Sequence, residues 1–233
     1  SSAFAHLSLS DAIEMSGEGT SELDISRAGF TYGETGLQSI LALLRAVDLS
    51  SFCCKCGGAA AMHKHKRCGI CGRRRDGANI VDYGSGVGNV VIGAALLVAA
   101  GLVRASSVRG VELLPTLHRA ASATVDDLLQ RFRTTHTSGE QLLRAPLPVV
   151  EVFCADLASS PYLADADVCY LCSTAFPREL VERWSIGAAA HLLPGSRVVT
   201  LSRPLVHPSF QLEQSMRCAL SWGDENAYVH RVL

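Results

Sequence analysis

The sequence predicts an α/β fold in which a mostly parallel sheet is closed by an antiparallel hairpin. From residue 79 onward, short apolar segments alternate with longer segments of helical period, which is the pattern of βαβ units. A glycine-rich loop joins the first of these strands to the helix after it, as in Rossmann-like sheets. The last two apolar segments follow each other with no helical pattern between them, so they predict the hairpin.

The elements can be assigned in order along the chain. Residues 37–47 place three leucines and an isoleucine on one face, so a helix is expected there. Segment 79–83 is a short apolar strand that ends at the glycine loop, and 90–102 is a helix that is apolar on most faces. The other expected elements are strands at 107–113, 148–153, 168–171 and 197–201, helices at 116–133 and 178–193, a polar loop at 134–147, and a hairpin formed by 210–222 and 227–233.

Composition allows a large buried core, since 48% of the 233 residues are hydrophobic and 18% are charged. The formal net charge is −1, so the chain as a whole does not predict nucleic-acid binding. Segment 53–75 differs, because it carries seven basic residues and no acidic one. We find no signal peptide, and the apolar run 90–103 is too short to span a bilayer, so no membrane partner is expected.

Five of the nine cysteines fall within residues 53–71, which favours metal ligation over disulfide bonding. Two CxxCG motifs with eleven residues between them present paired thiolates, as a tetrahedral zinc site requires. We expect Cys53, Cys56, Cys68 and Cys71 to hold one structural zinc in a small zinc-knuckle insert. Cys54, His63 and His65 are spare ligands, and a redox disulfide pair is the alternative. The basic residues of 55–75 form either a solvated surface or a contact with DNA phosphates.

The central motif is VDYGSGVGN at 81–89, between the first strand and its helix. Gly84 and Gly86 let a ligand approach the backbone, because neither carries a Cβ. A dinucleotide fingerprint would require Gly or Ala at position 89, where this chain has Asn89. S-adenosylmethionine has no pyrophosphate and needs close backbone approach and a carboxylate, so we expect it as the cofactor.

Acidic residues after the next two strands complete the expected cofactor site. Glu112 ends the second strand, where a carboxylate can accept hydrogen bonds from both ribose hydroxyls. Asp156 follows the third strand and is placed to meet the adenine amino group, with Leu157 against the ring. Together with Asp82 in the first strand, these residues predict S-adenosylmethionine binding far more specifically than a glycine loop alone.

Several motifs together resemble the Dot1 family of histone H3 lysine methyltransferases. Segment 81–90 is similar to the family's VDLGSGVGQVV, and YGET at 32–35 resembles the loop that closes over the methionine end of the cofactor. GVE at 110–112, ADL at 155–157, the strand and proline loop at 198–205, and SW at 221–222 followed by YVH at 228–230 also resemble family segments. The likeness covers residues 30–50 and 79–233, so it leaves the cysteine-rich insert unexplained.

The resemblance implies a class I methyltransferase that acts on a lysine in the globular core of histone H3 within nucleosomes, in the nucleus. It implies catalysis mainly by orientation and desolvation in a narrow channel. Where the family has an asparagine pair, this chain has Cys172 and Ser173, similar to the protozoan branch, and one of them is expected to give polar cover. The residues that it implies are Tyr32, Glu34, Thr35 and Cys172 around the cofactor, and Phe176, Ser173, Ser202, Trp222 and Tyr228 along the channel.

The sequence therefore predicts three regions: an N-terminal segment at 1–51 with the closing loop, the zinc-binding basic insert at 52–77, and the methyltransferase domain at 78–233. One alternative is a Rossmann-like methyltransferase that acts on another protein, on RNA or on a small molecule. An alternative of another class is a zinc-bearing chromatin-binding module with a degenerate cofactor pocket.

Overall fold

The computed structural model describes residues 35–47, 77–137, 145–159 and 164–233. The expected zinc ligands and most of the basic insert therefore lie outside the described residues, as do Tyr32 and Glu34. The described elements are α2 (Leu37–Ala46), β1 (Ala78–Tyr83), α3 (Asn89–Ala99), β2 (Ala105–Glu112), α4 (Pro115–Thr137), β3 (Val149–Cys154), the short 3-10 helix η2 (Leu157–Ser159), β4 (Val168–Leu171), the 3-10 helix η4 (Ser173–Ala175), α5 (Arg178–His191), β5 (Arg197–Leu201), β6 (Phe210–Leu220) and β7 (Gly223–Val232).

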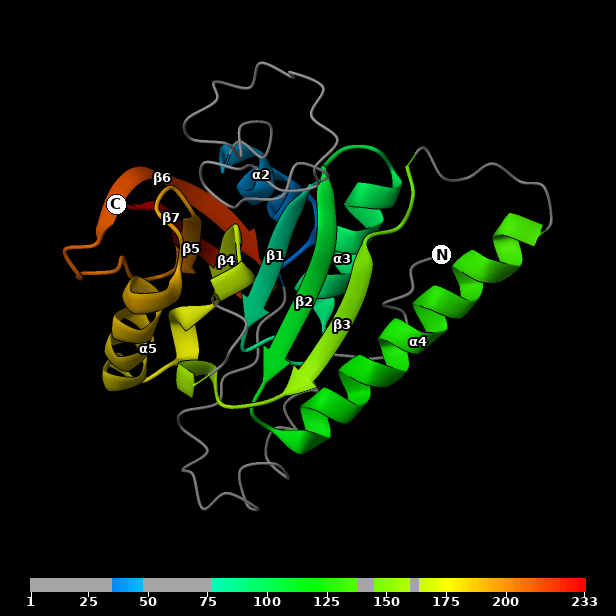
Figure 1. Cartoon of the computed structure of the whole chain (residues 1–233), viewed down its shortest axis with the longest axis horizontal. Helices are drawn as coiled ribbons and strands as arrows, with labels where there is room; N and C mark the ends of the chain where they lie inside the picture. The colour runs from blue at the N-terminus through cyan, green and yellow to red at the C-terminus, as the bar shows by residue number, and fades with distance from the viewer. Residues whose placement is uncertain (1–34, 48–76, 138–144, 160–163) are drawn as a thin grey trace.

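The strands form one seven-stranded sheet in the order β3-β2-β1-β4-β5-β7-β6 (Figure 1). The first five strands pair in parallel, and β7 is antiparallel to both β5 and β6. This topology confirms the predicted α/β sheet and its closing hairpin. The chain moves outward from β1 to β3 and then returns to β4, so the strand order reverses between β1 and β4. The carboxyl ends of parallel strands meet at one edge, and such a reversal is where open α/β sheets bind ligands.

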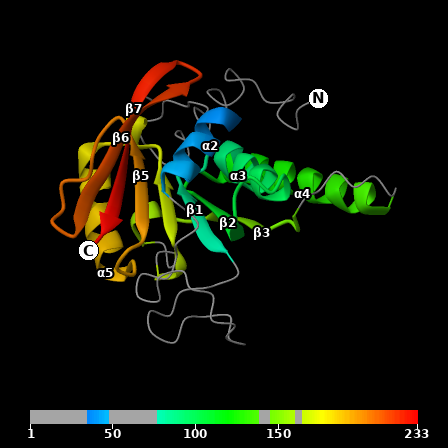
Figure 2. The same cartoon turned by 90° about the horizontal axis from the view of Figure 1, so that it is seen from above.

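The helices form layers on the two faces of the sheet (Figures 1 and 2). One core joins α2, α3 and α4 to the sheet and includes Ile40, Ile92 and Leu128. A second core lies on the other face and joins α5 to the strands, with Trp184 as its largest side chain. The Trp184 ring meets the ring of Tyr83 edge-on, with 5.3 Å between centroids, and so packs α5 against the end of β1.

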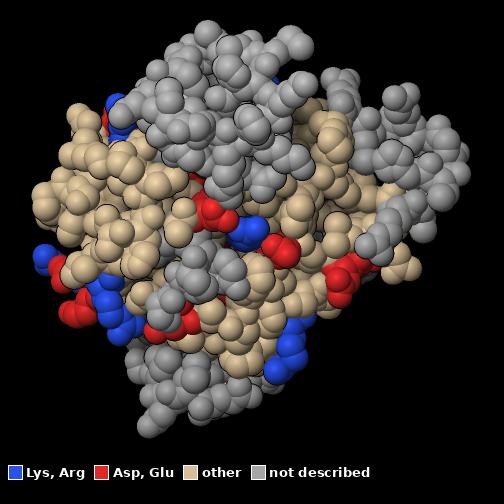
Figure 3. Space-filling model, viewed as in Figure 1, with Lys and Arg blue, Asp and Glu red and all other residues tan. Residues whose placement is uncertain are grey.

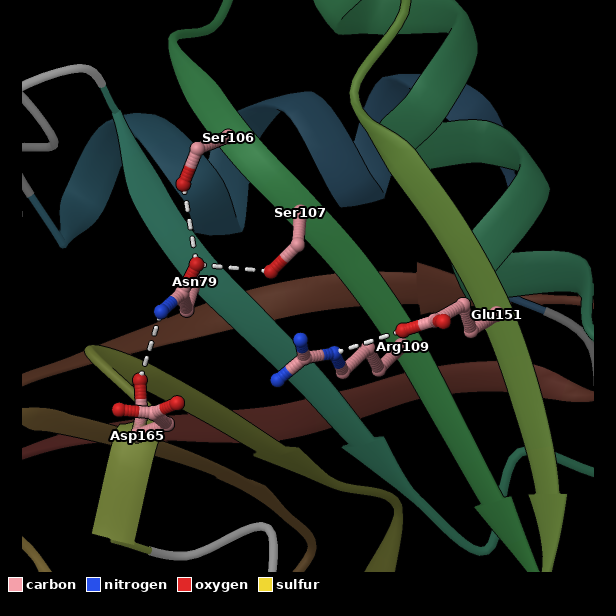
Figure 4. A network of polar contacts seen from close by, with 6 residues as sticks. All are labelled: Asn79, Ser106, Ser107, Arg109, Glu151 and Asp165. Atoms are coloured by element: carbon pink, nitrogen blue, oxygen red, sulfur yellow. Dashed lines mark hydrogen bonds and ion pairs between the residues drawn. The ribbon is translucent and has the colours of Figure 1, made fainter.

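β1 is buried along its whole length, because it lies inside the sheet with packed layers on both faces. This explains why its sequence is a continuous apolar run rather than an alternating pattern. Asn79, near its start, is a buried polar exception whose side-chain amide makes three hydrogen bonds (Figure 4). Its Oδ1 accepts hydrogen bonds from the hydroxyls of Ser106 and Ser107, and its Nδ2 donates to the carbonyl of Asp165. These bonds fix the amino end of β1 against its neighbours.

Helix ends account for most differences between prediction and structure. The polar loop predicted at 134–147 is partly wrong, because α4 continues through Thr137. The sequence has no glycine or proline between Arg133 and Gly139, so nothing stops the helix earlier. α3 ends at Ala99 rather than at 102, because Gly101 adopts a left-handed conformation with φ of 71°. None of the helices in the described ranges has the length and the apolar run needed to cross a membrane.

Candidate active site at the carboxyl edge of the sheet

The loop after β1 contains three glycines in the left-handed region, with φ of 77° at Gly84, 56° at Gly86 and 88° at Gly88. A side chain at any of these positions would be strained. The amides of Gly84 and Ser85 donate to the carbonyl of Val111, at 2.8 and 3.1 Å, so the loop folds back against the end of β2. Gly88 then caps the N-terminus of α3, and Asn89 begins that helix half-buried.

Glu112 lies at the end of β2 beside this loop, as the sequence predicts, and is almost fully buried. One carboxylate oxygen accepts a hydrogen bond from the Gly86 amide at 2.8 Å, and the other accepts one from the Leu114 amide at 2.8 Å. Burial raises the pKa of Glu112, while the backbone donors lower it. Glu112 therefore fixes the loop, and each of its oxygens retains a further lone pair for a ligand.

Asp82, just before the loop, is also buried at this edge. Its pKa is raised well above the ordinary value, first by burial and then by the negative charge of Glu112. A raised pKa means that the charged form of this carboxyl is disfavoured here, and a cationic ligand beside it would favour that form again. The edge of the sheet where β1 and β2 end is therefore suited to hold positive charge.

Thr35 is the part of the predicted closing loop that the structure describes. It bridges to Leu220 at the end of β6, and its hydroxyl forms a 2.8 Å hydrogen bond with the hydroxyl of Tyr170. Tyr170 is the register partner of Asp82 across the β1–β4 pair. A residue far away in sequence thus reaches the strand pair at which the order of the sheet reverses.

Asp156 and Leu157 follow β3 on the other side of the loop. The amide of Ala155 donates to the carbonyl of Glu112 at 2.9 Å and ties this turn to the end of β2. Asp156 accepts a bond from the Ala158 amide at 2.9 Å and lies 3.9 Å from the guanidinium of Arg183. Leu157 is buried. The structure thus brings Asp156 to the predicted edge, and its contact with adenine stays a prediction.

The turn after β4 carries three of the predicted residues in different surroundings. Cys172 is partly buried, and burial raises the pKa of its thiol to about 11, so it is protonated at neutral pH. Ser173 is fully buried and donates to the carbonyl of Leu201 at 2.6 Å, so it joins β4 to β5. The prediction that Ser173 lines the channel does not fit this position, because its hydroxyl is committed to the backbone. Phe176 points its ring at the glycine loop, where a Cβ on Gly84 would overlap the ring tip.

The remaining predicted channel residues come from β5 and the hairpin. Ser202 follows β5 and is the one non-glycine residue with positive φ, 66°, among the described residues. Trp222 lies on the β6–β7 turn and is 38% exposed. Tyr228 pairs with Thr200 and is half-buried. It shares a strand face with His230, 6.5 Å away between ring centroids, and this face packs in the core that contains α5.

Two polar residues of this edge were missed from the sequence. Thr174, in η4, hydrogen-bonds the hydroxyl of Ser202 at 2.7 Å, and Ser202 donates to a carboxylate oxygen of Glu225 at 3.0 Å. Neither Thr174 nor Glu225 belongs to a recognisable motif. Only the register of β5 against β7, with Leu201 opposite Ala227, could have suggested that Glu225 reaches this edge.

Charged side chains on the face shown in Figure 3 are mixed in sign over the part of the chain that the structure describes. One mixed pair is Arg109 on β2 and Glu151 on β3, 3.1 Å apart across the sheet (Figure 4). Within the described ranges, no group of three or more histidine, cysteine or acidic side chains could hold a metal ion. The predicted zinc ligands lie outside those ranges.

No family model and no curated protein sequence matches the chain. Solved structures do match. Over 99% of this chain and 88% of the other, the chain is similar to magnesium protoporphyrin IX methyltransferase from Synechocystis PCC 6803 with bound S-adenosylmethionine, at 12% identity and a TM-score of 0.53. It is also similar to TrmN from Thermus thermophilus, at 20% identity and a TM-score of 0.49, over 67% of this chain and 44% of that one. An RNA methyltransferase from Salinibacter ruber in complex with S-adenosyl-L-homocysteine matches at 21% identity and a TM-score of 0.44, over 66% and 80% of the two chains.

The chain thus spans less than half the length of TrmN but most of the protoporphyrin methyltransferase. At these identities, the likeness concerns the fold. None of the three names is that of a histone methyltransferase, so the expectation of a histone substrate rests on the sequence motifs alone. The topology and the full-length match agree that this chain has the Rossmann-like, class I fold of S-adenosylmethionine-dependent methyltransferases.

Proposed function

We propose that the protein is a methyltransferase that uses S-adenosylmethionine. The observation that carries the proposal is the glycine loop at the switch point, held by the buried carboxylate of Glu112. The whole arrangement lies at the carboxyl edge of the sheet, at the point where the strand order reverses and where open α/β sheets bind ligands. A chromatin-binding module with a degenerate cofactor pocket would not require three left-handed glycines beside two buried acids.

The residues of this edge fit S-adenosylmethionine better than a dinucleotide. The cofactor carries positive charge on its sulfonium and ammonium groups, and its binding would favour the charged forms of Asp82 and Glu112, whose pKa values are raised by burial. The left-handed Gly86 lets the ligand approach the backbone. At Gly84, the space that a Cβ would take is filled by the Phe176 ring. Asn89 stands where the dinucleotide fingerprint requires a small residue for close helix packing.

When bound, the cofactor supplies an activated methyl carbon on a positively charged sulfur. The protein's own contribution is to position and to exclude water. Glu112 and the glycine loop hold the adenosyl end, and Thr35 and Tyr170 pack beside Asp82 at the switch point. Phe176 covers the loop from the β4 side and so shields it from solvent.

We further propose a lysine in the globular core of histone H3, on nucleosomes in the nucleus, as the substrate. The support is the combination of YGET, VDYGSGVGNVV and the late SW motif in one chain. In this proposal, the basic residues of 55–75 contact DNA phosphates, and Cys53, Cys56, Cys68 and Cys71 hold a structural zinc. Metal analysis of the purified protein tests the zinc proposal, which predicts about one zinc per chain, lost in Cys→Ser variants of the four ligands.

A labelled-methyl transfer assay tests the activity and its substrate together. Nucleosomes, free histones and RNA are offered with labelled S-adenosylmethionine to the wild-type protein and to Asp82→Ala as the inactive control. Label on histone H3 in nucleosomes is the expected result. Label on RNA alone would replace the histone substrate with the RNA alternative while leaving the methyltransferase proposal intact. No transfer to any acceptor in the presence of bound cofactor would count against both.

A further inference from the structure

The three residues Thr174, Ser202 and Glu225 form a continuous hydrogen-bonded chain at the carboxyl edge of the sheet. They come from η4, from the loop after β5 and from β7, and the two links measure 2.7 and 3.0 Å. All three side chains are half-buried, so these hydrogen-bonded residues lie between the core and the solvent. Because three separate segments meet here, the contact is made by the fold rather than by a local turn.

The direction of the chain follows from its chemistry. A carboxylate can only accept hydrogen bonds, so the Ser202 hydroxyl donates its proton to Glu225. The oxygen of Ser202 must then accept from Thr174, which uses the single proton of the Thr174 hydroxyl. The oxygen of Thr174, at the outer end, keeps two lone pairs as acceptors. The Cys172 thiol, 3.9 Å away, donates to one of them, which leaves the other for a further donor. In the described residues, no lysine or arginine forms an ion pair with Glu225, so its charge is not neutralised there.

Ser202 is held in this chain at a conformational cost. A non-glycine residue at φ of 66° is conformationally strained, and such residues persist only where the surrounding structure holds them in place. The amide of Ser202 donates to the carbonyl of Asn226 at 2.7 Å, which fixes the backbone against β7 in addition to the two side-chain bonds. Strain of this kind occurs preferentially at functional sites.

The position of Thr174, Ser202 and Glu225 relative to the glycine loop indicates what these residues do. Thr174 and Phe176 belong to one short turn, and the Phe176 ring reaches the loop at Gly84. Glu112 and Asp156 lie on the opposite side of the loop, at the ends of β2 and β3. A ligand that spans the switch point, with one end over β2 and β3, has its other end beside the turn that carries Thr174.

We propose that Thr174, Ser202 and Glu225 bind and orient the group that accepts the methyl, with the Thr174 oxygen taking a hydrogen bond from an N–H or O–H of that group. This inference rests on the proposed function. The unneutralised carboxylate at the inner end favours binding of an amine, neutral or protonated, and disfavours an anionic group such as a carboxylate. A protonated amine must first lose a proton to water, because only the neutral nitrogen has the lone pair that attacks the methyl carbon as the bond from that carbon to sulfur breaks. Thr174 contacts the acceptor in this account, while Ser202 and Glu225 are positioning residues that act through it.

The first experiment measures binding of small probes by nuclear magnetic resonance, without any turnover. Butylammonium and butyrate, which differ in charge but have similar size, are titrated into the full chain with and without S-adenosylhomocysteine. Butylammonium is expected to shift the resonances of residues 174 and 202, with an affinity that falls about tenfold in Thr174→Val and Glu225→Gln. Asp224→Asn is the matched control, because it removes the same charge one residue away, and it should leave the affinity unchanged. Equal binding of butyrate, or butylammonium binding that is insensitive to both substitutions, would overturn the proposal.

The second experiment separates this proposal from the proposed function. Calorimetry with S-adenosylmethionine is expected to give the same affinity for wild type, Thr174→Val and Thr174→Ser. In methyl transfer, kcat/KM should fall about tenfold in Thr174→Val and recover in Thr174→Ser, which restores the hydroxyl. If the wild-type protein does not bind S-adenosylmethionine, the proposed function is refuted. The titration of butylammonium without S-adenosylhomocysteine would still decide whether Thr174, Ser202 and Glu225 bind an amine. If the cofactor binds but kcat/KM is unchanged in Thr174→Val, the role of Thr174, Ser202 and Glu225 is refuted and the proposed function stands.

Discussion

Glu112→Gln is the substitution whose effect can be worked out most fully from the structure. The carboxylate accepts one backbone hydrogen bond on each oxygen, from Gly86 and from Leu114, both at 2.8 Å. Glutamine replaces one oxygen with an NH2 group, which then faces a backbone N–H that can only donate. One bond to a charged acceptor, about 1.5–3 kcal/mol, is lost. Part of this loss is offset in the fold, because burial raises the pKa of Glu112 and thus disfavours its charge.

Because the charge of Glu112 is disfavoured by burial, Glu112→Gln should change the free energy of unfolding less than the affinity for S-adenosylmethionine. We expect the unfolding free energy to fall by only about 1 kcal/mol. The affinity for S-adenosylmethionine should fall more, because the loop loses its anchor and the cationic ligand loses a negative charge. A loss of about 2 kcal/mol in binding corresponds to a roughly 30-fold weaker Kd.

Calorimetry with S-adenosylmethionine and denaturant unfolding measure these two quantities. The matched control is Glu151→Gln, on the neighbouring strand β3, where the carboxylate pairs with Arg109 in a half-exposed position. Such a pair contributes about 0–1 kcal/mol to stability, and it lies away from the loop, so the affinity should not change. Wild-type cofactor affinity in Glu112→Gln would refute the reasoning.

Three further predictions concern single residues around the site. Gly84→Ala should destabilise the fold by about 2 kcal/mol or more, since it combines a left-handed φ with overlap on the Phe176 ring. In a Phe176→Ala background, only the backbone cost of about 1–2 kcal/mol should remain. Strictly additive changes in the free energy of unfolding would contradict this prediction. Ser202→Gly should be more stable than Ser202→Ala by about 1 kcal/mol in urea unfolding, because both lose the hydroxyl and only glycine accepts φ of 66° without strain; equal midpoints would show that the backbone is not strained. His230 is buried and accepts a hydrogen bond from the Leu205 amide at 3.1 Å, and burial lowers its pKa. Its contribution to stability is therefore complete above the unfolded-state pKa of about 6.5. This contribution is lost as the pH falls below about 6.5 toward the lower pKa of the folded state. Because the buried acids of the site act in the opposite sense, the melting temperatures of wild type and His230→Gln should be compared at each pH, and the difference between them should shrink from pH 7.5 to pH 5; a constant difference would contradict the assignment.

The central part of the fold could be predicted because its information is local. The apolar strand, the glycine loop and the helix of 79–102 are contiguous, and Glu112 lies at the end of the next strand, so the loop and the carboxylate beside it could be placed from the sequence. The hairpin could be placed for the same reason, since its two strands are adjacent in the chain. Helix ends were less accurate, as at α4, where no glycine or proline before Gly139 stops the helix at the predicted residue 133.

The resemblance named Ser202 as a channel residue, but its contacts with Thr174 and Glu225 could not be predicted, because they depend on packing between distant segments. Thr174, Ser202 and Glu225 meet only through the pairing of β4, β5 and β7. The same packing buries Ser173, one residue before Thr174, so adjacent hydroxyls have different surroundings. A motif resemblance aligned this turn with a channel, but it could not show which of the two side chains faces outward.

A crystal structure of the chain with S-adenosylhomocysteine tests the central claim most directly. We expect ligand density against the backbone of Gly86, with the ribose within hydrogen-bonding distance of Glu112, the sulfur toward the turn that carries Thr174, and the Phe176 ring still packed on Gly84. Density elsewhere, or a glycine loop packed shut by side chains in crystals that contain saturating ligand, would contradict it.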